Sequence, residues 1–484
     1  MISSAIISPL YCGSLKLAFL ESPVQDTNSR TEEQIMLKDK IRRFIYLFLI
    51  SLLVSAFDAN AKGVSLIRDA EIEDTIKSYL FPLFKAANLS TDNINVVIIN
   101  NPAVNAFVAD GSKVYIYTGL LLKASSANQI IAVLAHETGH IVGGHVIRLK
   151  ESMRIAARYT LLSAMVGGLV AVASKRPDAG FAVMAGGIGS AQANMMTYRV
   201  SEENSADSIA VDLLVKTHES LQGLVDVMRL IKKESLLYPN TQFVYYRTHP
   251  LTKDRIAFAE KAYADHKDIG VNMDYEKSFA RIKAKLLAFL GDADKIYNIV
   301  NGRDDTDSLY ALSIYYLRKN NVAAAVKVLD RLIAREPENP YFYELKGQVL
   351  FENGKYKESL APYRKALALK PDNALMVAEL AHAEIEGGSK EDLLKVGERI
   401  NSVLLKEKFD PSIWRLYATC YSRAGDKTKE AYGMAEYNLL RGDYGAAGYY
   451  AEKANKNVLE GTPMWFNIQD ILLNVKNNSK GGKK

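Results

Sequence analysis

Three of the seven histidines of the chain lie within eleven residues, in the segment AHETGHIVGGH (135–145). If this segment is helical, His136 and His140 are four positions apart and project from one face, where both imidazoles can bind the same cation. The preceding run ANQIIAVL predicts a buried helix that begins near Ser125 or Ser126, because either serine can cap it. The segment therefore predicts a metal site built on a core helix.

His145 is a weak candidate for a third metal ligand. In the extended pattern H-E-x-x-H-x-x-G-x-x-H, a glycine breaks the helix and a histidine follows the second histidine by six positions. Gly143 stands at the glycine position, but the histidine position is occupied by Val146. On a continuing helix, His145 would point roughly opposite to His136, at about 100° per residue. We therefore expect His145 to be a buried or hydrogen-bonded helix residue and not a ligand.

A carboxylate from the later segment YRVSEENSADSIAVDLL (198–214) is a better third ligand. Glu203 and Asp207 are four positions apart on a predicted helix, so they share a face. A carboxylate is an accepted zinc ligand in catalytic sites, and Glu203 is the preferred candidate, with Glu202 as its main competitor. Asp207 would then lie one turn away, where it could accept a hydrogen bond from the outer nitrogen of a ligand histidine. The alternative for Asp207 is a solvated helix charge.

Two further candidates lie in the segment RTHPLTKDRI (247–256). His249 precedes Pro250, which favours a loop or turn from which the imidazole could approach a site from the side. Its two possible functions are to donate a hydrogen bond to a developing oxyanion or to occupy the open metal position in a resting state. Arg255 could assist the oxyanion. The alternatives are the N-terminal residue of a helix for His249 and an ordinary surface arginine for Arg255.

The segments NAFVADG, HETGH with the following His145, EENSAD and THPLTKDRI occur in this order along the chain. In this the chain resembles the HtpX and CAAX prenyl protease family of gluzincins, and within it the secreted BepA-type branch of periplasmic proteases. The resemblance covers essentially the whole mature chain. It implies an α+β, zincin-like fold: a mostly helical metalloprotease domain with a small β-sheet, followed by an all-α solenoid of tetratricopeptide repeats.

The resemblance also implies a site. It implies one zinc ion per chain, with His136, His140 and Glu203 as ligands and Glu137 as the base, and it supports Asp207. Three protein ligands leave zinc one open position for water, whose pKa the metal lowers toward about 7. Glu137 would take a proton during attack on an internal peptide bond and pass it to the leaving amine.

The N-terminal part of the chain carries the features of a secretory signal peptide. The segment KDKIRRFIYLFLISLLVSAFDANAKG (38–63) contains a basic region, an apolar run from Phe44 to Val54 and a small-residue site that predicts cleavage after Ala61. We expect Met36 to be the initiator and residues 1–61 to be an extension plus signal peptide. The mature chain then keeps one cysteine, Cys420, which we expect to be a small apolar residue in a helix core.

The expected protease domain, residues 62–295, contains one clear β-hairpin. Its strands are NAFVA and VYIYT, joined by a turn at Asp110-Gly111, and the run INVVIIN offers a third strand. A small sheet beside the histidine helix is relevant because proteases often bind extended substrates by adding them to an exposed edge strand. A purely structural hairpin is the alternative.

Two apolar segments follow the histidine helix, YTLLSAMVGGLVAVAS and AGFAVMAGGIGSAQA, separated by KRPD. Both are short for a membrane span, so they predict a helical hairpin within residues 159–194. We expect this hairpin to pack in a core or between domains, and contact with a membrane or with substrate is the alternative.

Residues 300–475 have the character of tetratricopeptide repeats, and 476–484 form a basic tail. Pro337 and Pro371 are 34 residues apart, which is the period of this repeat. We expect four to five repeats forming a solenoid whose concave face can hold an extended partner. Other positions that fit the repeat signature or its core are Tyr316, Ala325, Tyr343, Gly347, Tyr363, Ala366, Trp414, Tyr417 and Tyr421.

The formal net charge of +6 is modest and comes from interspersed residues, so we expect no nucleic-acid partner. Weak attraction to anionic surfaces leaves peripheral membrane contact open. The favoured function is a periplasmic endopeptidase with chaperone-like activity on misassembled envelope proteins such as outer-membrane β-barrel precursors. Its repeats are expected to bind the outer-membrane β-barrel assembly machinery. The alternative is a repeat-based binding protein with a vestigial or structural metal site. An intact Glu137 favours the first, because a structural site needs no base.

Overall fold

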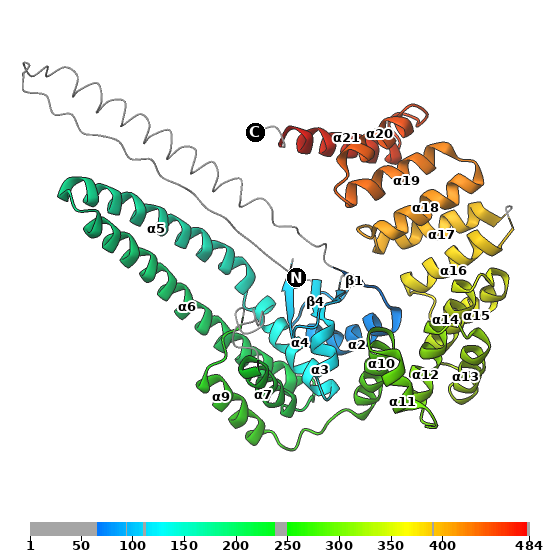
Figure 1. Ribbon diagram of the computed structural model, residues 1–484, viewed down its shortest axis with the longest axis horizontal. Helices are drawn as coiled ribbons and strands as arrows, with labels where there is room; N and C mark the ends of the chain where they lie inside the picture. The colour runs from blue at the N-terminus through cyan, green and yellow to red at the C-terminus, as the bar shows by residue number, and fades with distance from the viewer. Residues whose placement is uncertain (1–64, 93, 110–112, 238–248, 390–391, 482–484) are drawn as a thin grey trace, which may run out of the picture. The chain divides into compact units, whose positions relative to one another are not determined.

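The computed structural model describes residues 65–481 except residues 93, 110–112, 238–248 and 390–391. The expected signal peptide, the start at Met36 and cleavage after Ala61 lie outside the described residues, as does the turn at Asp110-Gly111. Within the described residues, a mostly helical α+β domain with a small sheet is followed by an all-α array of helix pairs (Figure 1). The predicted fold class is confirmed.

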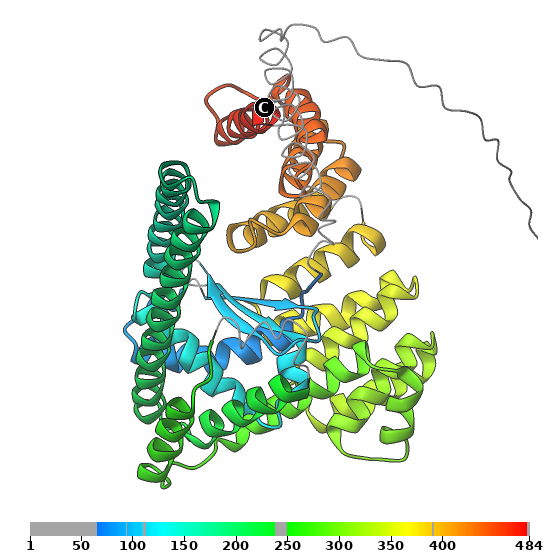
Figure 2. The ribbon, with the colours of Figure 1, turned by 60° about the vertical axis from the view of Figure 1, so that its left-hand side comes forward.

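The sheet has four strands, drawn as arrows in Figure 2. They are β1 (Leu66–Ile67), β2 (Asn95–Ile99), β3 (Ala106–Ala109) and β4 (Lys113–Tyr117), in the order β1-β2-β4-β3. β3 and β4 pair antiparallel as the hairpin pattern predicts, and β2, the predicted third strand, pairs parallel with β4. β3 is therefore an edge strand of this sheet, and it contacts the histidine helix.

The helices of the first part surround α4, which carries the histidine motif. They are α2 (Ala70–Ala86), α3 (Thr118–Lys123), α4 (Ala127–Val142), α5 (His145–Ser174), α6 (Pro177–Lys216), α7 (Gln222–Leu237), α9 (Lys253–Asp265) and α10 (Met273–Leu290). The side chain of Ser126 caps α4 by accepting a hydrogen bond from the Gln129 backbone, as one of the two predicted starts requires. Every residue of α4 from Ala127 to His140 is buried. The motif thus lies in the middle of the core.

Helices α5 and α6 form the predicted hairpin, but the expectation that it packs in a core is wrong. Between Tyr159 and Ser190, the buried residues are Gly167 and Gly180, and most of the large apolar side chains are exposed. The two helices contact each other along the hairpin and run side by side in Figures 1 and 2. Helix α6 then continues without a break into the segment that carries Glu203 and Asp207.

The second part begins with α11 (Ala293–Val300) and continues as successive helix pairs. They are α12 (Thr306–Arg318), α13 (Val322–Arg335), α14 (Pro340–Glu352), α15 (Tyr356–Leu369), α16 (Ala374–Gly387), α17 (Leu393–Lys406), α18 (Pro411–Ala424), α19 (Lys427–Leu440), α20 (Tyr444–Asn455) and α21 (Pro463–Gly481). The described residues thus contain five helix pairs, in agreement with the expected four to five repeats. The basic tail expected at 476–484 begins inside α21.

The signature residues of the repeats occupy core positions. An added Cβ at Gly347 would lie 2.7 Å from the Tyr363 ring, so glycine is needed for the close approach of α14 and α15. Trp414, Tyr417 and Tyr421 are buried together on α18, as predicted. Cys420 is buried beside them and donates a weak hydrogen bond to the Leu393 carbonyl oxygen.

A buried charge cluster joins the N-terminal helix α2 to α10 and to the first repeat. The Lys285 ammonium lies 2.8 Å from Asp69 Oδ2 and 3.3 Å from Glu71 Oε2. Tyr310 donates a hydrogen bond of 2.7 Å to the same Glu71 carboxylate. Although burial opposes the charge, the surrounding carboxylates raise the pKa of Lys285 well above its usual value. Lys285 is therefore a charged lysine in the interior.

We expect the Lys285→Ala variant to be less stable by about 3–5 kcal/mol, because it leaves the buried Glu71 carboxylate and the half-buried Asp69 carboxylate without their cation. The measurement is the free energy of unfolding from chemical denaturation. Lys277→Ala, an exposed lysine on the same helix, is the matched control and should change stability by less than about 0.5 kcal/mol. Equal stability of the two variants would contradict the importance of this cluster.

Candidate metal centre

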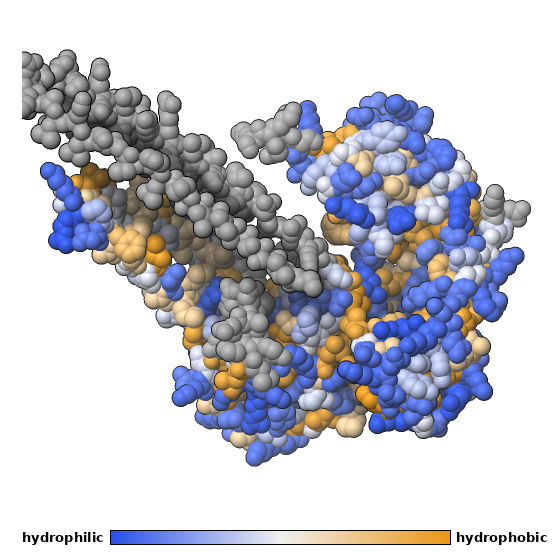
Figure 3. All heavy atoms as spheres, viewed as in Figure 1, coloured by the Kyte–Doolittle hydropathy of each residue, from blue (hydrophilic) through white to orange (hydrophobic). Residues whose placement is uncertain are grey.

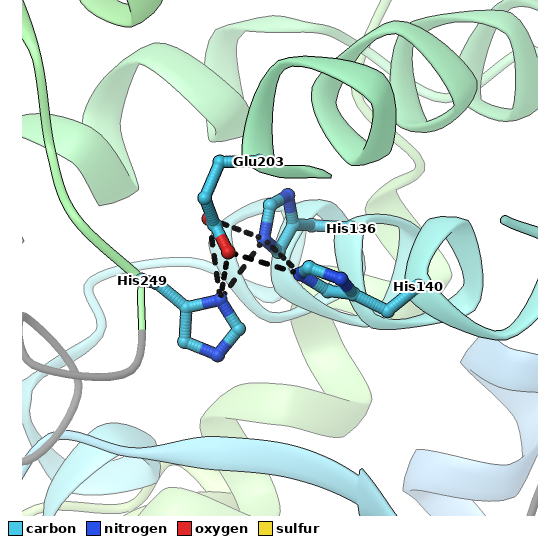
Figure 4. A group of neighbouring side chains, drawn as sticks. All are labelled: His136, His140, Glu203 and His249. Carbon is cyan, nitrogen blue, oxygen red and sulfur yellow. Dashed lines mark hydrogen bonds and ion pairs between the residues drawn. The ribbon is translucent and has the colours of Figure 1, made fainter. Parts of the chain in front are cut away.

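Three predicted ligands converge on one point (Figure 4). His136 and His140 point from one face of α4, and their Nε2 atoms are 3.1 Å apart. Glu203 approaches from α6, with its carboxylate oxygens 3.3 Å from His136 Nε2 and 3.4 Å from His140 Nε2. One ligand atom each from His136, His140, Glu203 and His249 lies within 4.8 Å of the others. The geometry suits a single ion held between α4 and α6.

A glycine inside the motif permits this convergence. An added Cβ at Gly139 would lie 2.6 Å from the carbonyl oxygen of Ala206 on α6. Any larger residue would push the two helices apart at the level of Glu203. The variable position before the second histidine is thus a packing position, and the sequence alone gave no reason to single out Gly139.

Asp207 and Arg255 support the ligands from behind. Asp207 Oδ1 lies 2.8 Å from His136 Nδ1, the nitrogen that points away from the converging atoms. Arg255 donates to both oxygens of Asp207 at 2.6 and 2.9 Å, and its Nη1 lies 2.8 Å from Glu203 Oε2. Arg255 is buried and not on the surface. Because its guanidinium pairs with both carboxylates, Arg255 is a residue that positions the ligands.

His249 reaches the cluster from the loop before α9. Its Nδ1 lies 3.1 Å from Glu203 Oε1 and 3.3 Å from His136 Nε2. Its Nε2 lies 3.5 Å from Glu137 Oε1. The next residue, Pro250, accepts a hydrogen bond from Arg255 through its carbonyl oxygen. The loop is thereby connected to the charged network, and the imidazole lies between the ligands and the expected base.

His145 lies close to the cluster but outside it. The helix does not continue, because Gly144 has a left-handed conformation with φ of 67° and α5 begins at His145. The His145 ring therefore turns back to His140, with their Nδ1 atoms 2.8 Å apart. His145 Nε2 lies 3.0 Å from Glu202 Oε2. Glu202, the competitor for the third ligand, faces His145 and not the converging atoms.

Sequence reasoning missed this second supporting chain. Arg148 pairs with Glu202, Glu202 with His145, and His145 with the outer nitrogen of His140. This chain supports His140 in the same way as the pairing of Arg255 with Asp207, and of Asp207 with His136, supports His136. Outer-layer hydrogen bonds of this kind fix the ring orientation of a ligand histidine. The sequence signal was the pair Gly143-Gly144, which ends α4 and returns the next histidine toward the site.

The electrostatics of the site favour a bound cation. Although burial opposes protonation, the Asp207 and Glu203 carboxylates raise the pKa of His136 to about 10. Burial would raise the pKa of Glu203, but His249 and the other two histidines hold it far below the usual range. The formal charges of a divalent cation and Arg255 balance those of Glu137, Glu203 and Asp207. The donor set therefore fits a divalent metal ion.

A cavity of about 190 Å³ opens next to the cluster. Its lining includes Phe107 and Val108 of the edge strand β3 together with Glu137, His140 and Glu203. Glu137 is buried, its Oε1 has no hydrogen-bond partner among the described residues, and burial raises the pKa of its carboxyl group. The carboxylate that would act as base thus lies between the ligands and the strand.

Comparison with known proteins identifies the family. Residues 67–263 match the model of peptidase family M48, and residues 310–374 match a tetratricopeptide repeat model. Metalloprotease YcaL of Escherichia coli K12 is 30% identical over 210 residues, which cover 41% of this chain and 78% of that protein. The chain belongs to peptidase family M48.

Two other relatives from Escherichia coli are similar to the chain. The beta-barrel assembly-enhancing protease of Escherichia coli K12 is 24% identical over 385 residues, covering 78% of this chain and 77% of that protein. Metalloprotease LoiP of the same organism is 27% identical over 194 residues, covering 38% and 71%. The prediction of a metallopeptidase domain followed by tetratricopeptide repeats is confirmed, and the protein is a metalloprotease of the M48 family.

Neighbouring glutamates of this M48 domain allow a direct test of the ligand set. We expect Glu203→Ala to weaken metal binding by more than about 100-fold, because it removes a ligand and not merely a supporting group. Glu202→Ala is the matched control: Glu202 supports His140 only through His145, so its loss should weaken metal binding by about 10-fold. Elemental analysis after dialysis at controlled free metal measures both. Retention in Glu203→Ala with loss in Glu202→Ala would transfer the ligand role to Glu202.

Proposed function

We propose that the protein is a periplasmic zinc-dependent endopeptidase that hydrolyses peptide bonds of unfolded or misassembled envelope proteins. The observation that carries the proposal is the position of Glu137. It is buried beside the converging ligand atoms, follows His136 directly, and has one carboxylate oxygen without a hydrogen-bond partner among the described residues. That oxygen is suited to receive a proton from an attacking water.

The two imidazoles and one carboxylate are a donor set typical of catalytic zinc. When bound, zinc polarises the scissile carbonyl and lowers the pKa of water toward about 7. Glu137 takes the proton of the attacking water and passes it to the leaving amine. Asp207 keeps His136 in one orientation, and Arg255 holds Asp207 and Glu203 in place.

The edge strand β3 supports an extended substrate. Its partner in the sheet is β4, so its other edge is available among the described strands. The backbone of Val108 lies within hydrogen-bonding reach of Glu137, so a peptide added to this edge would pass beside the base. Backbone pairing of this kind needs an unfolded segment, which fits misassembled proteins better than folded ones.

The repeats supply a second binding surface. A solenoid of helix pairs can hold an extended partner against its concave face. A relative with the same two domains is named a beta-barrel assembly-enhancing protease, and we extend that role to this protein. The proposed partners are outer-membrane β-barrel precursors and the machinery that assembles them, bound in a chaperone-like manner by the repeats.

The alternative, a repeat-based scaffold with a structural metal site, is favoured by one observation. His249 Nδ1 lies among the ligand atoms, so four protein ligands could close the site. A closed site would still not explain a buried glutamate placed between the ligands and the edge strand. We therefore propose that His249 is a resting fourth ligand that leaves when substrate enters.

Glu137→Gln separates catalysis from folding. The substitution nearly preserves side-chain size and removes the base, so the variant should remain folded and metal-loaded while proteolysis of an unfolded envelope protein falls by at least about 100-fold. Cleavage is followed by gel analysis, and metal content by elemental analysis. Undiminished cleavage would refute the mechanism. Removing the metal from the unchanged protein with a chelator should lower proteolysis to a similar extent.

His249→Ala tests the resting-ligand role. Because the imidazole competes with water for the open position, its loss should raise basal proteolysis of the same substrate. His266→Ala, a histidine at the end of α9 outside the cluster, is the matched control and should leave activity unchanged. A fall in turnover of about 100-fold or more would instead assign His249 as an oxyanion donor. Unchanged activity would remove it from the site.

A further inference from the structure

The hairpin of α5 and α6 carries large apolar side chains that the described chain leaves uncovered. Leu161, Leu169 and Val172 on α5 are 63%, 70% and 79% exposed, and Phe181 on α6 is 65% exposed. Figure 3 shows apolar colouring along the visible part of this hairpin. Contiguous exposed apolar surface in a soluble protein marks an interaction site.

The hairpin is held together by small residues and not by its apolar side chains. An added Cβ at Gly167 would lie 2.6 Å from the Gly180 carbonyl oxygen, and one at Gly187 would lie 2.0 Å from Ser163 Oγ. Close helix contact through glycine and serine is typical of packing in membranes, where apolar side chains gain nothing by facing inward. The contact therefore leaves the larger side chains on the outside.

The distribution of these side chains favours lipid over a protein groove. Phe181 and Val183 are both exposed, yet they lie about 200° apart around α6. On α5, Leu161, Leu169 and Val172 are exposed, whereas Gly167, which contacts α6, is buried. A groove covers one face of a hairpin, whereas an acyl-chain environment surrounds it. The described stretch Ile147–Ser174 also has the length and composition of a membrane span. An 18-residue window within it has a mean hydropathy of 1.6, and 6% of that window is buried.

Charges occur at the two ends of the hairpin and not between them. Sixteen uncharged residues separate Arg158 from Lys175, and twenty separate Asp178 from Arg199. At a rise of about 1.5 Å per residue, these stretches are about 24 and 30 Å long, close to the thickness of a hydrocarbon core. Residues 146–158 carry four basic residues and one acidic residue. The base of the hairpin therefore suits anionic headgroups.

We infer that the α5–α6 hairpin inserts tip first into an anionic lipid bilayer, with its basic base at headgroup level. This inference goes beyond the proposed peptidase function, because it places the metal centre next to a membrane. Glu203 follows Arg199 by four residues on α6, and His145 is the first residue of α5. The metal centre would then lie within a few helical turns of the membrane surface, where polypeptides entering or leaving the bilayer are within reach.

Vesicle binding of the full chain tests the inference. The probe is extruded vesicles of phosphatidylglycerol and phosphatidylethanolamine, separated by flotation. Leu162→Asp/Leu169→Asp places two charges at hydrocarbon depth and should lower partitioning by at least about 100-fold. Leu405→Asp/Leu459→Asp, which alters two exposed apolar residues of the repeats, is the matched control and should bind as the unchanged protein does.

Insertion has its own spectroscopic signature. Leu169→Trp should show a blue-shifted emission with these vesicles and quenching by brominated acyl chains, whereas Leu405→Trp should show neither. The inference would be overturned if the hairpin variant bound vesicles as well as the unchanged protein does. It would also be overturned if the unchanged protein did not bind vesicles. If the unchanged protein did not bind vesicles but self-associated, and the hairpin variant did not, the surface would be assigned to a second copy. If it instead captured unfolded protein and the variant did not, the surface would be assigned to substrate. Cleavage of a short soluble peptide should be unaffected in Leu162→Asp/Leu169→Asp, which separates this test from that of the peptidase.

Discussion

The close contact between α4 and α6 is the constraint on which the metal centre depends. α4 supplies two imidazoles from one face, but a two-histidine helix face cannot complete a site alone. The third ligand arrives because Gly139 lets the Ala206 backbone approach to a distance that a Cβ would forbid. That approach places Glu203 between the two histidines and Asp207 behind His136. The spacing of four residues on each helix is useful only because this contact sets the two faces against each other.

The contact also concentrates charge in a place where charge is costly. Glu137, Glu203 and Asp207 are buried with Arg255, and Arg255 compensates for one of these carboxylates. A divalent cation compensates for the other two, so metal binding and stability of this region are linked. The same reasoning explains why the outer nitrogen of each ligand histidine begins a chain of polar contacts that ends at an arginine: Arg255 for His136 and Arg148 for His140. A carboxylate that orients an imidazole must itself be paired when water is excluded.

Much of this arrangement was readable from the sequence. The ligand spacing, the edge hairpin and the repeat period all follow from local periodicity, which is why they could be predicted from residues such as His136, Glu203 and Pro337. Other features depend on contacts between distant segments. Arg255 was a candidate for assisting the oxyanion, with a surface arginine as the alternative, but it is buried and pairs with Asp207. The direction of His145 depends on the left-handed Gly144, which follows α4. The hairpin was expected to be buried because apolar segments usually are. Its glycines instead let α5 and α6 pack closely, which leaves the larger side chains on the outside, and this contact between two helices cannot be read from either segment alone.

Helix α6 connects the exposed hairpin to the buried centre in one piece. It runs from Pro177 near the hairpin tip to Lys216 without a break, and Glu203 and Asp207 lie in its second half. Helix α5 starts at the histidine that contacts His140. A displacement of the hairpin relative to α4 would therefore move a metal ligand from one side and a supporting histidine from the other. The apolar surface and the catalytic centre share two helices, so whatever covers the hairpin also bears on the geometry of the site.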